Sequence, residues 1–187
     1  MKGWLLLLTV FLAVAACGRT SGPVEIPGDD LPFDVARPES PTGTPATAST
    51  QVAYFVQAGR LVERPREFDA TPSAAGGVLR VLLEGPLPEE RRGGVATEIP
   101  NGVRLLDVSV VDDLARVDLS GEFQEPAPPE RIALRVAQVV WTLTALPSVR
   151  SVSFSIDGEP IAVTTDGGAA VARRVSRQDY AALAPAR

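Results

Sequence analysis

Two runs of alternating apolar and polar residues, joined by the pair Asp112-Asp113, constrain the fold of this chain more than any other feature. The apolar positions are Leu106, Val108 and Val110 in the first run, and Ala115, Val117 and Leu119 in the second. Side chains two residues apart lie on the same face of a strand, and a short polar turn joins neighbouring antiparallel strands. The pattern therefore predicts an antiparallel hairpin with one apolar face.

Two segments that flank this hairpin have helical spacing instead. In the first, Thr71-Pro72 indicates the N-cap and first helical residue, and Gly85-Pro86 ends the helix. In the second, Pro128-Pro129 begins the helix, and an apolar stripe follows over residues 132–143. Residues 88–101, between the first helix and the hairpin, are predicted to form a loop.

Further strands are predicted outside the helices. Residues 52–57 and 60–64 favour an N-terminal hairpin, while residues 151–156 alternate strictly and turn back at residues 161–163. The order is then strands, helix, hairpin, helix, strands. Such an order predicts an α+β domain of two layers, in which two main helices cover one face of a mostly antiparallel sheet.

The N-terminus indicates export. Residues 1–16 contain a lysine and a short apolar run, and Cys17 follows two alanines. A permanent membrane helix requires about 20 apolar residues, and this run is too short. We interpret residues 1–16 as a signal peptide whose removal leaves Cys17 at the new N-terminus. The alternative is an ordinary secretory signal with an incidental cysteine.

The residues Val14-Ala15-Ala16-Cys17 resemble the lipobox of bacterial lipoproteins, in which the cysteine carries a diacylglyceryl thioether. Cys17 is the only cysteine, so no partner for an intrachain disulfide exists. Two acyl chains anchor a protein stably, whereas one does so only marginally. The resemblance implies lipidation at Cys17, with palmitate-type chains, and a location on the extracytoplasmic face of the bacterial cell membrane.

The remaining chain divides into three parts. Residues 17–50 contain the lipidated cysteine and a proline- and threonine-rich stretch without hydrophobic period, which predicts a disordered tether. A proline-rich recognition motif is the alternative for this stretch. Residues 51–164 form the predicted domain. Residues 165–187 form a C-terminal tail with a short helix, which begins at a capping box from Ser176 to Asp179.

Composition excludes several classes of chemistry. The 187 residues include no histidine, and Asp plus Glu number 23 against 18 Lys plus Arg. Without histidine, neither Ser-His-Asp nor Cys-His nucleophile systems nor histidine metal ligation can form. The acidic balance argues against nucleic acid as a partner. We therefore expect no enzyme activity, no cofactor and no catalytic or metal-binding residue.

The candidate residues each have a simpler structural interpretation. Asp112-Asp113 occupies the predicted turn, while Asp107 and Asp118 fall on the polar face of the hairpin. Paired acids could hydrolyse glycosidic bonds or bind calcium, but a turn and a solvated face explain these positions. Ser120 lacks a G-x-S-x-G elbow and a histidine to activate it.

Three other features remain open between two interpretations. Gly76-Gly77 could favour an anion at the start of a helix, although neither a P-loop nor G-x-G-x-x-G is present. Arg91-Arg92 is either a solvated part of the loop or a contact to acidic lipid or a partner. Trp141 lies one step outside the apolar stripe and is either a buried edge residue or an exposed interface anchor.

Six segments in order resemble the GerMN domain, a family named from a spore-germination lipoprotein. They are Tyr54-Phe55, Leu82-Leu83-Glu84-Gly85-Pro86, Ile99-Pro100-Asn101-Gly102, Val117-Asp118-Leu119-Ser120, Thr142-Leu143-Thr144-Ala145-Leu146-Pro147 and the segment from Val149 to Gly158. The resemblance covers about Val52 to Val163. It implies an exported, lipid-anchored α+β domain without established catalytic residues, related to the N-terminal part of actinobacterial LpqB-type lipoproteins.

These features together predict a non-enzymatic cell-surface lipoprotein, held at the membrane through Cys17. We expect its GerMN-like domain to bind another envelope protein or to assemble with itself, in sporulation, germination or envelope signalling. The alternative is binding of a small molecule or a cell-wall fragment in a pocket beside the sheet.

Overall fold

The computed structural model describes residues 48–186, and this part of the chain begins with a hairpin. Strands β1 (Ala48–Gln57) and β2 (Arg60–Asp69) pair antiparallel along their whole length. The turn between them places Ala58 and Gly59 at positive φ. The predicted hairpin is confirmed and is longer than expected, because β1 begins ahead of the domain boundary predicted at residue 51.

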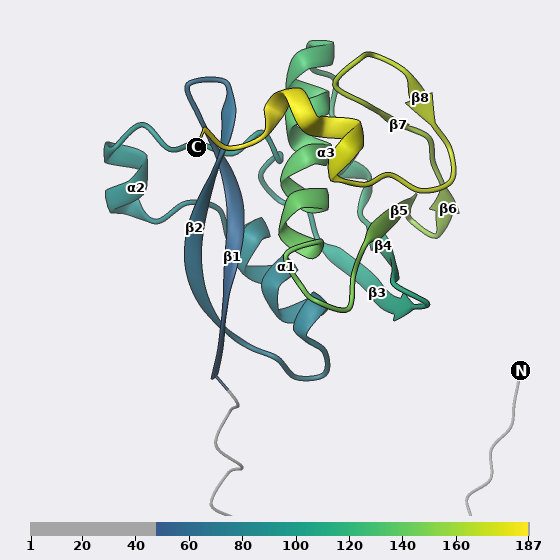
Figure 1. Ribbon diagram of the computed structural model, residues 1–187, viewed down its shortest axis with the longest axis horizontal. Coiled ribbons are helices and arrows are strands. Elements are labelled where there is room, and N and C mark those ends of the chain that lie inside the picture. The colour runs from purple at the N-terminus through teal and green to yellow at the C-terminus, as the bar shows by residue number, and fades with distance from the viewer. Residues whose placement is uncertain (1–47, 187) are drawn as a thin grey trace, which may run out of the picture. The chain divides into compact units, whose positions relative to one another are not determined.

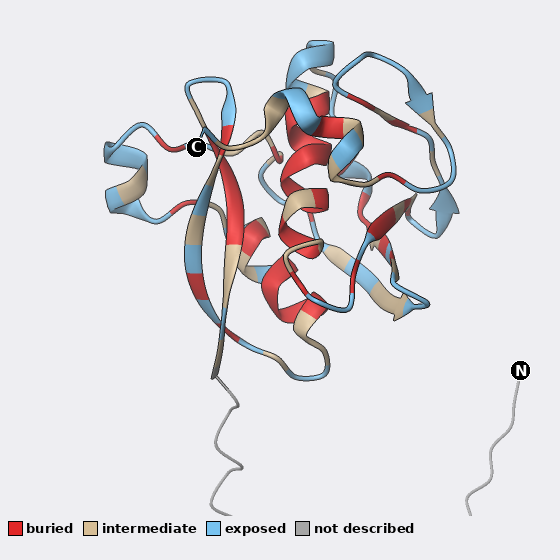
Figure 2. Ribbon diagram, in the orientation of Figure 1, coloured by how far each residue is buried: buried red, intermediate tan, exposed pale blue. Residues whose placement is uncertain are grey.

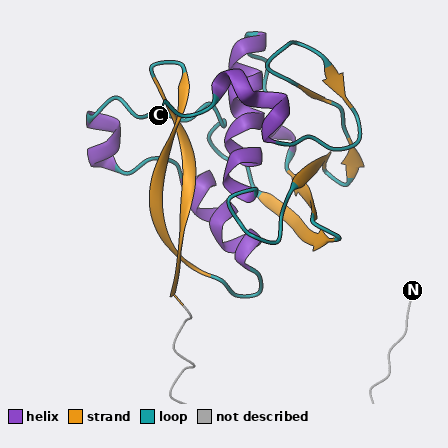
Figure 3. Cartoon of the chain, viewed as in Figure 1, coloured by secondary structure: helices purple, strands orange, loops and turns teal. Residues whose placement is uncertain are grey.

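Helices α1 (Ala74–Glu84) and α3 (Pro129–Leu143) lie between this hairpin and a second sheet (Figures 1 and 3). The second sheet contains β3 (Leu105–Val111), β4 (Leu114–Leu119), β5 (Ser151–Ile156) and β6 (Glu159–Pro160), in that order. Both helices contact β1 and β2, while α1 also contacts β3 and α3 contacts β5. The predicted α+β class is confirmed.

One pair of strands in the four-stranded sheet is parallel. Strands β3 and β4 form the predicted antiparallel hairpin, whereas β4 and β5 run in the same direction. A parallel connection needs a crossover long enough to return the chain to the starting edge. Here the crossover consists of the 3-10 helix η2 (Gly121–Gln124) followed by α3. The second predicted helix is thus the element that aligns β5 beside β4.

The core lies where the two helices face the strands (Figure 2). The predicted stripe of α3 is buried at Val136, Val139, Val140 and Leu143. In α1 the fully buried positions include Leu79 and Leu82. Strands β1 and β5 complete the cluster, chiefly through Phe55 and Phe154. Burial of these apolar side chains is the main stabilising contribution to the domain.

Two details of the first helical region differ from the sequence prediction. The N-cap is Ser73 rather than Thr71, because the Ser73 hydroxyl accepts a hydrogen bond from the Gly76 N–H at 3.1 Å. The predicted loop at 88–101 also contains a short helix, α2 (Pro88–Arg92). It begins with proline at N1, and its Glu90 carboxylate accepts the Leu87 N–H at 2.8 Å. Capping by an acidic residue explains why this segment turns helical.

The C-terminal part of the chain is folded against α3. The predicted return after Asp157-Gly158 is present but begins earlier than residue 161, because β6 pairs antiparallel with β5. Strand β7 (Val163–Thr164) then pairs with β8 (Ala170–Val171) in a separate two-stranded sheet. The predicted short helix is η3 (Arg177–Leu183), a 3-10 helix. Its capping box is confirmed, since Asp179 Oδ2 accepts the Ser176 N–H at 2.7 Å. Within residues 48–186, no helix has the length and apolarity needed to cross a membrane.

Candidate functional site

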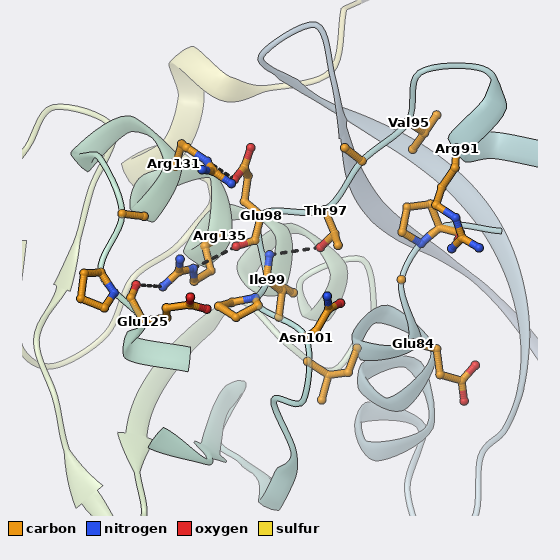
Figure 4. A pocket seen from close by; sticks show the side chains of 17 residues that line it. Glu84, Arg91, Val95, Thr97, Glu98, Ile99, Asn101, Glu125, Arg131 and Arg135 are labelled. Atoms are coloured by element: carbon orange, nitrogen blue, oxygen red, sulfur yellow. Dashed lines mark hydrogen bonds and ion pairs between the residues drawn. The ribbon is translucent and has the colours of Figure 1, made fainter. Parts of the chain in front are cut away.

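A groove of about 550 Å³ opens at one end of α3 and is the candidate site of this domain (Figure 4). Three segments surround it: the end of α1, residues 95–101 and residues 125–127. Arg131 and Arg135 of α3 line one end, whereas Glu84 and Arg91 lie at the other (Figure 4). Its volume falls within the ~300–1,000 Å³ of small-ligand sites.

Arg135 of α3 joins two of the segments that surround the groove. Its side chain is buried, with 4% of the residue exposed. Its Nε donates to the Glu98 carbonyl oxygen at 3.0 Å, and its Nη1 donates to the carbonyl oxygens of Phe123 and Glu125 at 2.7 and 2.8 Å. One guanidinium therefore holds residues from two separate loops against the helix.

The charge of Arg135 is not matched by an ion pair. Arg131 Nε pairs with Glu98 Oε2 at 2.6 Å, but none of the ion pairs within residues 48–186 includes Arg135. Burial lowers the pKa of Arg135 from its ordinary value, and the charges of Glu125 and Glu98 oppose this shift. The Arg135 guanidinium also lies 6.0 Å from the centroid of the Phe123 ring. Buried charges in proteins are usually paired, so a buried arginine whose hydrogen-bond acceptors are all carbonyl oxygens is an unusual arrangement.

A buried glutamine positions the loop that carries Glu98. Gln138 Oε1 accepts the Glu98 N–H at 2.8 Å, and the Gln138 side chain is fully buried. Ala96 in the same loop forms a bridge to β1, exchanging two backbone hydrogen bonds with Val56 at 2.7 and 2.8 Å. The wall of the groove is thus tied both to α3 and to the first strand.

Arg91 and Arg92, which the sequence placed in a loop, are the last two residues of α2. Arg91 lines the groove, and its guanidinium donates to the Pro86 carbonyl oxygen. Arg92 is exposed and donates to the Pro88 carbonyl oxygen at 3.4 Å. Both arginines are exposed, so a solvated surface describes Arg91-Arg92, and Arg91 in addition lines the candidate site.

The acidic residues of the hairpin lie outside the groove and have structural roles. Asp112 and Asp113 occupy the turn at positive φ, which is typical of tight turns in hairpins. Asp107 and Asp118 are cross-strand partners, and Asp118 Oδ1 accepts the Gly158 N–H at 3.0 Å. Residues 48–186 contain no group of three His, Cys, Asp or Glu side chains that could hold a metal ion.

The remaining candidates also have structural surroundings. Ser120 is buried beyond the end of β4, where its Oγ accepts the Arg104 N–H at 2.9 Å. Gly76 and Gly77 lie in α1, and a Cβ at residue 77 would come within 2.3 Å of the Asp69 carbonyl oxygen. Close packing of the helix on β2 therefore explains Gly77.

Trp141 is half-buried, with Arg177 stacked on its ring at 4.5 Å from the centroid. Neither full burial nor full exposure describes Trp141, because Arg177 of the C-terminal segment covers part of its ring. Cys17, the predicted signal peptide and the part of the predicted tether up to residue 47 lie outside the described residues.

Sequence reasoning missed Arg135 and Glu98. One signal was present: Arg135 directly precedes Val136, next to the apolar stripe of the second helix. A charged residue at the border of such a stripe indicates either a solvated edge or a buried cation with partners from another segment. The spacing of apolar residues in the helix does not distinguish these cases, because the hydrogen-bond partners of Arg135 are distant in sequence.

Comparison with known proteins identifies the family of this chain. The Germane family, described as sporulation and spore germination, matches residues 42–162. The chain belongs to the Germane family. The GerMN resemblance inferred from six sequence segments is thereby confirmed. No curated protein matches the sequence of this Germane chain.

Three solved structures share the fold of the Germane domain. The tandem GerMN domains of the sporulation protein GerM from Bacillus subtilis have a TM-score of 0.57 and 22% identity, over 71% of this chain and 48% of that one. The first GerMN domain of the same protein has a TM-score of 0.55 and 21% identity, over 70% and 98%. This chain thus spans about half of the tandem structure.

The third is a Clostridium perfringens protein described as a lipoprotein. It has a TM-score of 0.52 and 17% identity, over 74% of this chain and 93% of that one. At these identities the likeness concerns the fold alone.

Proposed function

We propose that this Germane protein is a non-enzymatic lipoprotein of the cell envelope, anchored through Cys17 and acting by binding another envelope protein or a second copy of itself. The family match over residues 42–162 is the observation that carries this proposal, since the family is described by sporulation and spore germination. The sporulation protein GerM and the Clostridium protein described as a lipoprotein support the same setting. The proposed context is sporulation, germination or envelope signalling.

The anchor is tested by cell fractionation. The wild-type chain is expected in the membrane fraction, with a mass that matches a diacylglyceryl group on Cys17. Cys17→Ser removes the thiol that forms the thioether, so the variant should be released or keep its signal peptide. Ser21→Ala, a nearby polar substitution, is the matched control and should stay at the membrane. A processed Cys17→Ser protein retained as well as the control would contradict lipidation.

The partner is tested by cross-linking on intact cells, followed by size-exclusion chromatography of the detergent-extracted chain. We expect one discrete product larger than the chain, either a homo-oligomer or a complex with a second envelope protein. Mass spectrometry of the product distinguishes these two cases. A strictly monomeric chain without a specific cross-linked product would overturn the proposal that this protein acts through protein contacts.

A second candidate function is binding of a small molecule or a cell-wall fragment. The groove beside α3 favours it, because a buried arginine without an ion pair lines a cavity of ligand size. Thermal melting of the purified chain with muropeptides tests this function. A rise in melting temperature with muropeptides would support it, and an unchanged melting temperature across the series would argue against it.

A further inference from the structure

We propose that the groove at α3 binds the terminal carboxylate of a peptide, with Arg135 as the buried receptor and Arg131 as the second cation. This inference rests on the second candidate function above and names the chemistry of its ligand. A protein C-terminus and a cell-wall stem peptide both supply a peptide carboxylate, and the experiment below separates the two sources.

The hydrogen-bonding capacity of Arg135 is only partly used. A guanidinium has five N–H donors. Nε and Nη1 of Arg135 donate to three carbonyl oxygens, and no residue within 48–186 accepts a hydrogen bond from its Nη2. The same side chain lines the groove, and also a smaller pocket beside residues 161–164, while only 4% of the residue is exposed. The Nη2 group is thus a donor held in place before any ligand arrives.

An anion would complete this arrangement. Removing a cation from water is costly, and an opposite charge with good hydrogen-bond geometry compensates that cost. Carbonyl oxygens orient the Arg135 guanidinium but carry no net charge. Charge-assisted hydrogen bonds are about twice as strong as neutral ones. A carboxylate bound to Nη2 of Arg135 would therefore gain more binding free energy than one bound to an exposed arginine.

The neighbouring charges favour one negative charge over two. Arg131 lies one helical turn before Arg135, and residues at this spacing are neighbours on a helix surface. Its ion pair with Glu98 offsets the nearest acidic side chain, and its own side chain is 58% exposed and so within reach of a ligand. Glu84 and Glu125 also line the groove. They would repel a phosphate dianion more than a carboxylate.

The rest of the groove suits a peptide. Polar atoms form most of the exposed surface of the groove, and apolar side chains and prolines also line it, namely Leu83, Pro86, Val95, Ile99, Pro100 and Pro126. Asn101 adds an amide that can both donate and accept a hydrogen bond. A short extended peptide presents apolar side chains and backbone amides together, and its terminal carboxylate would lie at the Arg135 end.

The experiment is a calorimetric titration of the full chain in detergent micelles. The probe is N-acetyl-tri-L-alanine, compared with its C-terminal amide, with a tripeptide ending in D-Ala-D-Ala and with inorganic phosphate. The free acid should bind at least about tenfold more tightly than the amide, since the neutral amide cannot form the stronger charge-assisted hydrogen bonds. Phosphate should bind more weakly than the acid. Preference for the L-peptide indicates a protein C-terminus, and preference for the D-Ala-D-Ala peptide indicates a wall source.

Variants assign the binding to the groove. Arg131→Ala should lower the affinity for the free acid several-fold. Asn101→Asp should lower the affinity for the free acid but not for the amide, because it adds a negative charge to the groove. Arg150→Ala is the matched control, since Arg150 is 82% exposed and does not line the groove. Arg135→Lys should lose most of the affinity. Should that variant fail to fold, the two exposed substitutions decide the question.

Equal affinity for acid and amide would overturn the inference, as would no binding of either at millimolar concentration. Equal effects of Arg131→Ala and Arg150→Ala would do the same. These outcomes leave the envelope proposal standing if a cross-linked partner is found. Conversely, loss of membrane anchoring or of cross-links would contradict that proposal without changing the titrations.

Discussion

Gln138 Nε2 of α3 donates a hydrogen bond to the Tyr54 carbonyl oxygen of β1 at 3.1 Å, across 84 positions of sequence. The Thr142 hydroxyl accepts the Tyr54 N–H at 2.9 Å, and both α3 side chains are fully buried. Unpaired backbone groups at a strand edge are costly when buried, and they invite pairing with another chain when exposed. Here a helix supplies the partners that another strand would otherwise provide, so the edge of β1 is closed at this residue.

Replacing Gln138 by leucine should destabilise the domain. The change leaves the Tyr54 carbonyl oxygen and the Glu98 N–H without their partner, and each buried unsatisfied group costs about 1–3 kcal/mol. Urea denaturation should show a free energy of unfolding lower by at least this amount. Gln178→Leu is the control, because Gln178 is exposed and its side chain forms no hydrogen bond in the described structure. Equal stability of the two variants would mean that the Gln138 contacts contribute nothing.

Two adjacent glycines of α1 should differ strongly in how much a substitution by alanine destabilises the domain. A Cβ at residue 77 would lie 2.3 Å from both the Asp69 carbonyl oxygen and Phe68 Cδ2, whereas the nearest atom at residue 76 is Ser73 Oγ at 3.2 Å. Gly77→Ala should lower the free energy of unfolding by about 1–3 kcal/mol through overpacking. Gly76→Ala should cost much less, because only the Ser73 hydroxyl must shift and because alanine favours a helix by ~1 kcal/mol over glycine. Thermal melting measures both, and a Gly77→Ala variant as stable as Gly76→Ala would refute the close approach.

Removing the Arg177 side chain should loosen the C-terminal segment. Its guanidinium stacks on the Trp141 ring at 4.5 Å, and its Nε donates to Thr144 Oγ1 at 2.8 Å. We expect Arg177→Ala to cost about 1–2 kcal/mol. Amide hydrogen exchange should then accelerate in residues 163–183, with Arg174→Ala as an exposed control. Protection unchanged from the control would show that the stacked arginine does not hold this segment.

The attachment of α2 to the hairpin should depend on pH. Burial acts to raise the pKa of Glu90, but hydrogen bonds from Arg66 and the Leu87 N–H, with the charges of Arg66 and Arg64, outweigh it and hold the pKa below 4.5. A depressed folded pKa stabilises the domain above the unfolded value, and this stabilisation is lost as the pH falls through the folded value.

Glu90→Gln should therefore lower the free energy of unfolding by about 1–3 kcal/mol at neutral pH, since it removes a charge-assisted pair with Arg66. The difference from wild type should shrink as the pH falls below 4.5. Urea denaturation from neutral to acidic pH measures this, with the exposed Glu89→Gln as control. A difference that stays constant over the range would exclude the titration of Glu90 as its cause.

Local pattern predicted most elements of this domain. The hairpin around Asp112-Asp113 and the helix after Pro128 were both evident from spacing and turn residues. Errors occurred where side-chain capping decided between neighbouring positions. Ser73 rather than Thr71 caps α1, and Glu90 turns part of a predicted loop into α2. Both depend on the direction in which one polar side chain points, which spacing does not specify.

The groove was not predictable in the same way. The sequence indicates only that Arg135 is a helical residue beside an apolar stripe. Its hydrogen-bond partners Phe123 and Glu98 lie 12 and 37 positions away in sequence. The parallel pairing of β4 with β5 is the related case, because it follows from the path of α3 and not from either strand's pattern. A strand's alternation defines its buried face but not its neighbour or direction.

The sequence by itself determined most of the elements, their order and the family, because periodicity and turns act between residues a few positions apart. Only the tertiary structure decided that Gln138 and Thr142 close the edge of β1, and that Arg135 lies buried without an ion pair. These contacts join distant segments, and their free energy arises only when packing removes water from all partners at once.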